Sequence, residues 1–227
     1  KSVTKMGNIK YELTPPASLQ DDLEKLNQRV LKAKEAGEES KLFWIVASTH
    51  EGEESLVLSA FKAARKELPH LHLILAPRHP ERFETVAKLI TEAGLTFDRR
   101  SDTELNHLSL EVDLWLIDTL GELLLFYAFS HITTVAGSFV PIGGHNILEP
   151  AYFSKPIIVG PYMDENSETL ADFLAQKAII QGSQEGLAEA VITLGRDVTL
   201  RESLGNNAQK WMMANQGGSE LILKALE

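Results

Sequence analysis

Residues 131–150 read HITTVAGSFVPIGGHNILEP. The run at 131–136 is apolar and rich in β-branched side chains, which predicts a buried strand. Residues 146–153 predict a helix that opens at Asn146, because asparagine is a preferred N-cap residue. A short buried strand that leads through a turn into a helix is the unit from which parallel α/β sheets are built.

The turn between this strand and this helix suggests a ligand. Gly143 and Gly144 allow positive φ and a close approach of the backbone to a bound molecule. The helix N-terminus offers free N–H groups to an anion, and Glu149 offers an acceptor for hydroxyl groups. A phosphate next to hydroxyls points to a nucleotide sugar. The alternative is a tight strand-to-helix turn that binds nothing.

The alternation of strand and helix continues on both sides of this stretch. We expect strands at 42–47, 71–76, 95–99, 112–117, 132–136, 156–159 and 178–181. We expect helices at 18–34, 53–68, 80–93, 120–129, 146–153, 168–177, 184–195, 199–215 and 219–226. This order predicts an α/β fold, a Rossmann-like parallel sheet with helices on both faces and right-handed crossovers.

Composition excludes several classes of protein. The chain has 227 residues, of which 44% are hydrophobic and 24% charged, and this is typical of a globular domain. Its net charge of −10 disfavours nucleic-acid binding. It has no cysteine, which removes disulfides, zinc–thiolate sites and cysteine nucleophiles. No apolar run reaches the ~18 residues of a membrane span, and neither a phosphate-loop nor a dinucleotide-binding glycine motif occurs.

The start of the chain sets the expected domain organisation. Residues 1–17 are expected to form a linker or entry segment, and residues 18–227 a nucleotide-sugar-binding domain. The first residue is lysine rather than methionine, so we expect a piece of a longer protein. The helices at about 199–227 are expected to pack back toward an N-terminal domain beyond this chain.

Ligands of open parallel sheets bind beyond the carboxyl ends of the strands, so the loops there are candidates. In the first such loop, Ser48 and Thr49 can donate hydrogen bonds to a phosphate or carboxylate. The alternative is that Thr49 caps the next helix and that Glu53 and Glu54 match its dipole. His50, in the same loop, is interpreted as a surface residue.

Two further loops add candidates at the same edge. Arg78 lies between Pro77 and Pro80, which stiffen the loop, and its guanidinium can pair with phosphate or stack on a base. Gly121 permits a close approach of the backbone to a base or ribose. The alternative for this last loop is that Asp118 caps the following helix.

Four motifs, in order, resemble those of the Kdo (3-deoxy-D-manno-octulosonate) transferases, which are GT-B glycosyltransferases of family 30. They are STHEGE at 48–53, PRHP at 77–80, DTLGEL at 118–123 and GGHNILEP at 143–150, and MGNIKY at 6–11 is similar to the interdomain stretch of that family. The resemblance implies a two-domain enzyme of lipopolysaccharide biosynthesis. Such an enzyme transfers Kdo from CMP-Kdo to a lipid A precursor, lipid IVA, with inversion. This chain is similar to the C-terminal, donor-binding half.

The resemblance also assigns binding residues. It implies contacts to CMP from Pro77, Arg78, Leu120, Gly121, Glu122, Asn146, Ile147, Leu148 and Glu149. We expect further contacts to the donor sugar or phosphate from Ser48, Gly137, Ser138 and Gly144. No catalytic residue is expected in this chain, because the family's base, acceptor surface and membrane anchor belong to the N-terminal half.

The same resemblance sets the expected partners. CMP-Kdo is the donor substrate, no cofactor is expected, and no metal is expected because no Asp-x-Asp motif occurs. The full-length enzyme is expected at the cytoplasmic face of the inner membrane, and this chain alone is expected to be soluble and inactive. Two alternatives stay open: the donor domain of a GT-B enzyme that uses a UDP- or ADP-sugar, and a non-catalytic module with a nucleotide fold.

Overall fold

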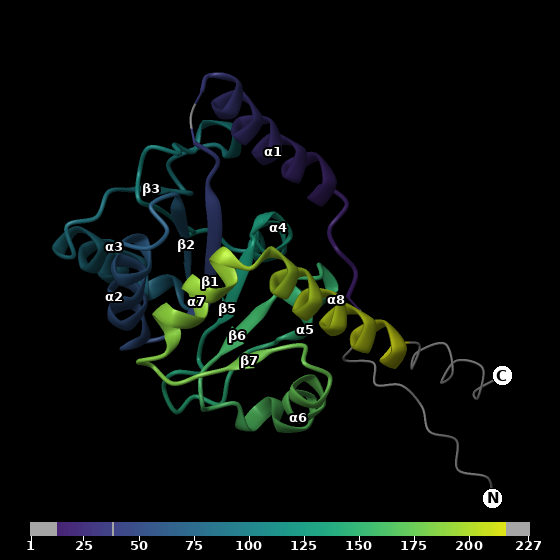
Figure 1. Ribbon diagram of the computed structural model, residues 1–227. Coiled ribbons are helices and arrows are strands. Elements are labelled where there is room, and N and C mark those ends of the chain that lie inside the picture. Colours follow the sequence, from purple (N-terminus) through teal and green to yellow (C-terminus); the bar gives the residue numbers. More distant parts are fainter. Residues whose placement is uncertain (1–12, 38, 217–227) are drawn as a thin grey trace, which may run out of the picture.

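The computed structural model describes residues 13–37 and 39–216, and within them one parallel sheet carries the fold (Figure 1). Its seven strands lie in the order β3-β4-β2-β1-β5-β6-β7, and all neighbouring pairs are parallel. The strands are β1 (Leu42–Thr49), β2 (Leu71–Pro77), β3 (Phe97–Arg99), β4 (Leu114–Leu116), β5 (Ile132–Val135), β6 (Ile157–Val159) and β7 (Ile180–Gln181). The predicted Rossmann-like parallel sheet is confirmed.

Helices cover both faces of this sheet (Figure 1). The α-helices are α1 (Leu19–Glu35), α2 (Glu53–Arg65), α3 (Phe83–Glu92), α4 (Leu123–Phe129), α5 (Leu148–Tyr152), α6 (Ser167–Ala175), α7 (Leu187–Arg196) and α8 (Val198–Asn215). The 3-10 turns among the described residues are η2 (Pro80–Arg82), η3 (Leu105–His107) and η4 (Asp164–Asn166).

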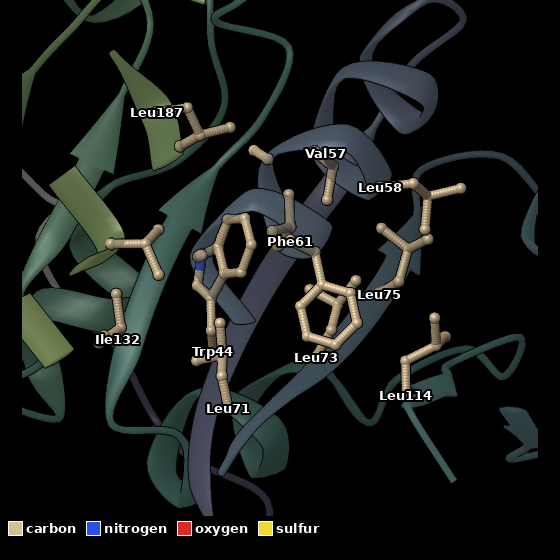
Figure 2. Close-up of a cluster of buried hydrophobic side chains, with 14 of the residues drawn as sticks. Trp44, Val57, Leu58, Phe61, Leu71, Leu73, Leu75, Leu114, Ile132 and Leu187 are labelled. Carbon is tan, nitrogen blue, oxygen red and sulfur yellow. The ribbon is translucent and has the colours of Figure 1, made fainter. Parts of the chain in front are cut away.

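The alternation of side chains along β1 explains why both faces are covered. Trp44 and Val46 point to one face and pack with residues of α2 and α7, among them Phe61 (Figure 2). Phe43 and Ile45 point to the other face and pack with α1 and α4. Because both sets are buried, β1 is apolar from Leu42 to Ala47, as expected for a central parallel strand. Each large side chain buried in this way stabilises the fold by roughly 1.5–3 kcal/mol.

A third cluster of buried side chains supports the region that contains α5. It joins β6 to α5, α6 and α8 through residues that include Ile157, Phe173 and Met212. The α8 helix comes so close to the chain after α5 that a Cβ on Gly205 would lie 1.9 Å from the backbone oxygen of Ser154. The short α5 is therefore held in place by the much longer α8.

Several helix boundaries differ from those predicted. The helix expected from residue 120 begins at Leu123, because Gly121 has a φ of 84° and lies outside the helical region. The helix expected from residue 146 begins at Leu148. The helix expected at 53–68 ends at Arg65, and Ser18 precedes α1 without a capping hydrogen bond from its side chain.

Two expectations lie outside the described residues. They are the helix at 219–226 and most of the entry segment at 1–17, whose residues 1–12 are not described.

The strand order places a switch point beside β1. The chain runs from β1 to β2 on one side and later returns to β5 on the other side of β1. In open α/β sheets, ligands bind in the crevice that such a reversal creates at the carboxyl ends of the strands. The loops that follow β1 and β5 therefore face each other across the expected site.

Candidate functional site

Two adjoining cavities lie at the carboxyl ends of β1, β2 and β4. Cavity A, about 210 Å³, is lined by Ser48, Ala76, Pro77, Arg78, Ile117, Thr119, Leu120, Gly121 and Leu123. Cavity B, about 190 Å³, is lined by Ser48, Arg78, Leu123, Tyr127, His145, Asn146 and Glu149. The two cavities share Ser48, Arg78 and Leu123. They bring together residues from all four loops that the sequence singled out.

Ser48 lies between the two cavities in an unusual backbone conformation. Its φ is 62°, which is uncommon for a residue other than glycine. The pairing of β1 with β2 shifts register between Ala47 and Thr49, so the strand bulges at this residue. Bulges next to ligand sites redirect side chains, and here the bulge puts the Ser48 side chain where both cavities meet.

Arg78 is exposed and lines both cavities. Its backbone N–H donates to the carbonyl of Thr49 at 3.0 Å, and Pro80 opens a 3-10 turn two residues later. Within the described part of the chain, its guanidinium forms no ion pair. The loop is thus held stiffly while its charge stays available to a ligand.

The loop after β4 contributes an apolar wall and a paired acid. Leu120 is 74% exposed and lines cavity A with Gly121. Glu122 lines neither cavity, because its carboxylate pairs with Arg100 at 2.6 Å and accepts from Thr119. Any contact that Glu122 makes to a nucleotide would therefore use its backbone.

Asp118, interpreted as a possible helix cap, has another role. It accepts a hydrogen bond from Arg99 at 2.7 Å and from the backbone of Ser101 at 2.8 Å. It thereby ties the end of β4 to the chain that follows β3.

The Asn146–Glu149 segment places two polar side chains in cavity B. The Asn146 side chain accepts from the Leu148 N–H at 3.0 Å and donates to Glu149 at 3.2 Å. Burial raises the pKa of Glu149, against the lowering effects of Asn146 and Arg78. Ile147 and Leu148 are buried in the core. The predicted N-cap at Asn146 is therefore wrong by one residue: Ile147 is the N-cap of α5, and the Asn146 side chain bonds the first helical N–H from the position before it.

The buried carboxylate of Glu53 joins two of the loops. It accepts the N–H groups of His50 at 2.9 Å, Gly137 at 2.8 Å and Phe139 at 2.9 Å. Burial raises the pKa of Glu53, and these three hydrogen bonds oppose that shift. The sequence pattern suggested only a match to the helix dipole, because two of the three partners lie more than 80 residues away.

Three glycine-loop residues have their polar groups turned into the protein. The Gly137 N–H is held by Glu53, and the Gly144 N–H donates to the Gly137 carbonyl at 2.8 Å. The Ser138 hydroxyl donates to Val135 at 2.6 Å and accepts from the Gly160 N–H at 2.8 Å. Their contacts to a donor sugar or phosphate stay a prediction.

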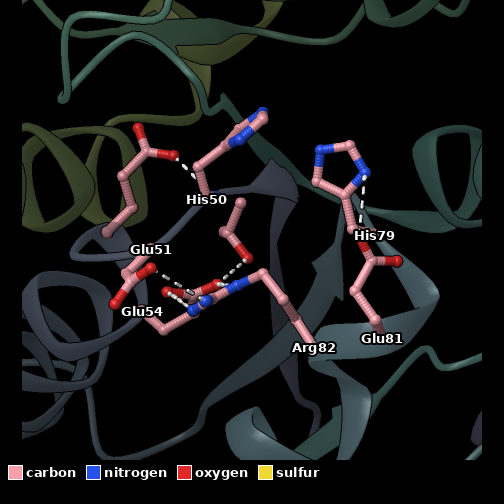
Figure 3. Close-up of polar contacts among 8 residues, drawn as sticks. His50, Glu51, Glu54, His79, Glu81 and Arg82 are labelled. Carbon is pink, nitrogen blue, oxygen red and sulfur yellow. Dashed lines mark hydrogen bonds and ion pairs between the residues drawn. The ribbon is translucent and has the colours of Figure 1, made fainter.

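A second buried acid fixes the loop after β2. Glu54 is fully buried and pairs with Arg82 at 3.0 Å while accepting from Thr49 at 3.1 Å (Figure 3). Arg82 also approaches Glu51 at 3.6 Å. The pattern explains why the chain carries acids at both positions 53 and 54: each acid anchors a different loop.

A group of histidines at this edge was missed in the sequence interpretation. The Nε2 atoms of His50 and His145 are 2.7 Å apart, and the His79 ring meets the His50 ring edge-on at 5.1 Å. Burial is the first cause that lowers the pKa of His145 to about 4, followed by His50 and Arg78. Burial also lowers the pKa of His50. The only signal in the sequence was that each histidine follows a predicted strand.

The described residues contain no group of three or more histidine, aspartate or glutamate side chains arranged to hold a metal ion. In the same part of the chain, every helix is too short or too polar to cross a bilayer.

Comparison with known proteins gives close relatives for this chain, although no family model matches it. It is 35% identical over 223 residues to the 3-deoxy-D-manno-octulosonic acid transferase of Haemophilus influenzae, a match that covers 97% of this chain and 50% of that protein. The protein of the same name from Bordetella pertussis is 32% identical over 186 residues, with 80% and 43% covered. The chain thus spans about half the length of the curated relatives it matches.

Solved structures agree with these relatives. The C-terminal CMP-Kdo binding domain of WaaA from Acinetobacter baumannii aligns with a TM-score of 0.73 and 29% identity, covering 83% of this chain and 97% of that one. HepE from Anabaena, in complex with UDP-glucose, aligns with a TM-score of 0.61 and 15% identity, covering 96% and 55%. The predicted fold, that of the C-terminal domain of a GT-B glycosyltransferase, is confirmed.

Proposed function

The chain belongs to the 3-deoxy-D-manno-octulosonic acid (Kdo) transferases, of whose length it matches about half, and from this we propose that it is the donor-binding half of such an enzyme. Its ligand is then CMP-Kdo. The full-length enzyme would transfer Kdo to a lipid A precursor such as lipid IVA in lipopolysaccharide synthesis, at the cytoplasmic face of the inner membrane. Neither a nucleic acid nor a cofactor enters this proposal.

The observation that carries the proposal is the pair of adjoining cavities that share Arg78. Each is smaller than the ~300 Å³ at which ligand pockets usually begin, so a nucleotide would span both. Cavity A, with Leu120 and Pro77, suits the flat face of a cytosine. Cavity B, with Asn146 and Glu149, suits the ribose hydroxyls and the phosphate.

The proposed chemistry is the departure of CMP. When the bond between Kdo and phosphate breaks, negative charge grows on the phosphate, and a guanidinium beside it stabilises that charge. Arg78 is placed for this role on its stiff loop. Because this cation can serve the phosphate, we propose that transfer needs no metal.

The other half of the reaction needs a base for the hydroxyl of the acceptor. In an inverting transfer, the base must lie on the face of the sugar opposite to the departing CMP. The two cavities hold the departing side, so we propose that the base lies in the other half of the enzyme.

The test is a comparison of nucleotides by calorimetric titration of the chain with CMP, UDP and ADP. We expect CMP to bind most tightly, because cavity A would be shaped for cytosine. A preference for UDP or ADP would indicate a different GT-B donor. If none of the three nucleotides binds, the chain is a non-catalytic module. The control for general charge effects is a Lys88→Ala variant, because Lys88 lies on α3 and lines neither cavity.

A further inference from the structure

Two imidazole rings form a close pair at the wall of cavity B. We name His50 and His145 the imidazole pair: their Nε2 atoms are 2.7 Å apart, and their ring centroids are 4.9 Å apart with 14° between the planes. His145 lines cavity B together with Arg78, and both histidines are only half-buried. The direct Nε2–Nε2 hydrogen bond joins the loop after β1 to the loop after β5.

The hydrogen bond fixes how protons are distributed in the pair. Two neutral imidazoles carry one N–H each, and one of these N–H groups must fill the bridge between the Nε2 atoms. Of the two outward Nδ1 atoms, one is then a donor and the other an acceptor. A single added proton makes both Nδ1 atoms donors and gives the pair one positive charge without breaking the bridge.

Several charged groups surround the pair. Arg78 and His79 face it from the end of β2, Arg82 from η2, and Glu149 from cavity B. Arg82 is already paired with Glu54, and the nearby Glu53 is satisfied by three N–H groups. Within the described residues, Arg78 is therefore the one cation lining cavity B that forms no ion pair.

A CMP-linked sugar acid brings two negative charges, one on the phosphodiester and one on the carboxylate. Arg78 can neutralise one of them. Resting on the proposed function, we propose that the imidazole pair binds the carboxylate of the donor sugar and takes up one proton from solvent as it does so. The pair would then distinguish an acidic sugar from a neutral one.

The electrostatics of the empty site agree with this role. Burial and the neighbouring cations lower the pKa of both His50 and His145, so the empty pair is neutral near neutral pH. A carboxylate at hydrogen-bond distance acts in the opposite direction and favours the charged form. The proton therefore arrives with the acid, and binding strengthens as the pH falls.

The test compares two ligands with the whole chain of 227 residues. CMP-Kdo carries the carboxylate, whereas the methyl phosphodiester of CMP carries the same phosphodiester charge without it. Calorimetric titrations at about pH 7, in two buffers of different ionisation enthalpy, give the affinity and the number of protons taken up. We expect about tenfold or tighter binding of CMP-Kdo, because hydrogen bonds to charged groups are strong, with uptake of up to one proton.

Variants separate the pair from its surroundings. His50→Gln and His145→Gln should reduce the preference for CMP-Kdo to near unity and abolish proton uptake, while binding of the methyl ester is kept. His107→Gln, on the distant η3 turn, is the matched control and should change neither. Proton uptake by the unmodified chain is informative even if a variant fails to fold.

The outcomes are distinct. Equal affinity for the two ligands overturns the role of the imidazole pair while leaving CMP binding intact. The same holds if CMP-Kdo is preferred without proton uptake and both glutamine variants keep that preference. Failure of both ligands to bind overturns the proposed function and this inference with it.

Discussion

Arg78 shows how a single residue can be both exposed and well positioned. Its loop is fixed by a hydrogen bond to Thr49 and by the 3-10 turn that starts at Pro80. Its side chain forms no ion pair with the described residues, and it lines both cavities. The stiff loop loses little backbone entropy on binding, and the unpaired guanidinium keeps its charge for the ligand.

We predict that Arg78→Ala weakens CMP binding by about 10- to 100-fold, the range expected when a charge-assisted hydrogen bond of about 1.5–3 kcal/mol is lost. The affinity of an Arg78→Lys variant should lie between those of the unmodified chain and the alanine variant, since lysine keeps the charge but loses the paired geometry. Calorimetric titration with CMP measures both. An unchanged affinity in the alanine variant would remove Arg78 from the phosphate site.

His72 is a buried residue with an unmet polar group. It lies in β2 against the rings of Phe43 at 5.4 Å and Trp115 at 4.8 Å, and its Nε2 atom has no hydrogen-bond partner among the described residues. Burial lowers its pKa to about 3, with Lys41 adding to that shift. The folded state therefore holds this imidazole neutral.

The sign of the resulting pH dependence follows from linkage. The unfolded chain binds a proton at His72 near pH 6.5 while the folded chain does not, so this contribution to stability is complete above about pH 6.5 and is lost as the pH falls toward about 3. His131, whose pKa burial lowers to about 4, acts in the same direction. We predict that His72→Phe makes the loss of stability shallower by up to about 1.4 kcal/mol per pH unit. Urea unfolding at several pH values measures it, and parallel profiles for the two proteins would contradict it.

At the scale of elements, the site depends on a short helix supported by a long one. The α5 helix has five residues, too few to be stable alone. Gln209 of α8 donates to the carbonyl of Tyr152 at 2.7 Å, and Gly205 lets the two segments meet. The α8 helix therefore supports α5, and with it the position of Glu149 in cavity B.

We predict that Gly205→Ala destabilises the fold by about 1–3 kcal/mol, the usual effect of overpacking. Alanine normally favours a helix over glycine by about 1 kcal/mol, so any loss comes from the clash with the Ser154 backbone. Gly182→Ala is the matched control, because no atom lies within 4 Å of its added Cβ. Urea unfolding compares the two, and equal midpoints would show that α8 can shift at no cost.

Elements and their order could be predicted from the sequence because hydrophobic periodicity is local. Helix starts were less predictable. Gly121 delays the start of α4 by its left-handed backbone, and α5 begins only at Leu148, so that Ile147 takes the N-cap position expected of Asn146. Candidate residues on single loops were predictable, whereas the His50–His145 contact was not, since it joins positions 95 residues apart.

At the scale of the whole molecule, the reversal of the chain beside β1 gathers four distant loops at one edge of the sheet. At that edge, the described residues form one wall of a site, which consists of cationic and hydroxyl side chains and an apolar surface. The chain also covers about half the length of its curated relatives. Donor binding is thus a property that we expect of this chain, and transfer a property of the longer enzyme.

We predict that this chain, given CMP-Kdo and lipid IVA, releases no CMP above the rate of spontaneous hydrolysis, because we propose that the base for the acceptor hydroxyl lies in the other half of the enzyme. The measurement is CMP release followed by chromatography. The full-length Haemophilus influenzae protein, half of which this chain matches, is the positive control. Turnover by this chain alone would refute the proposed division of labour.

The buried carboxylate of Glu53 has a consequence for the timing of motions at this edge. It holds three N–H groups from two loops that are more than 80 residues apart in the chain. Either loop must break its own hydrogen bonds to Glu53 before it can move outward, and leaving a buried carboxylate unsatisfied costs free energy. Outward movements at this edge are therefore rare, and Glu53, the first residue of α2, holds both loops.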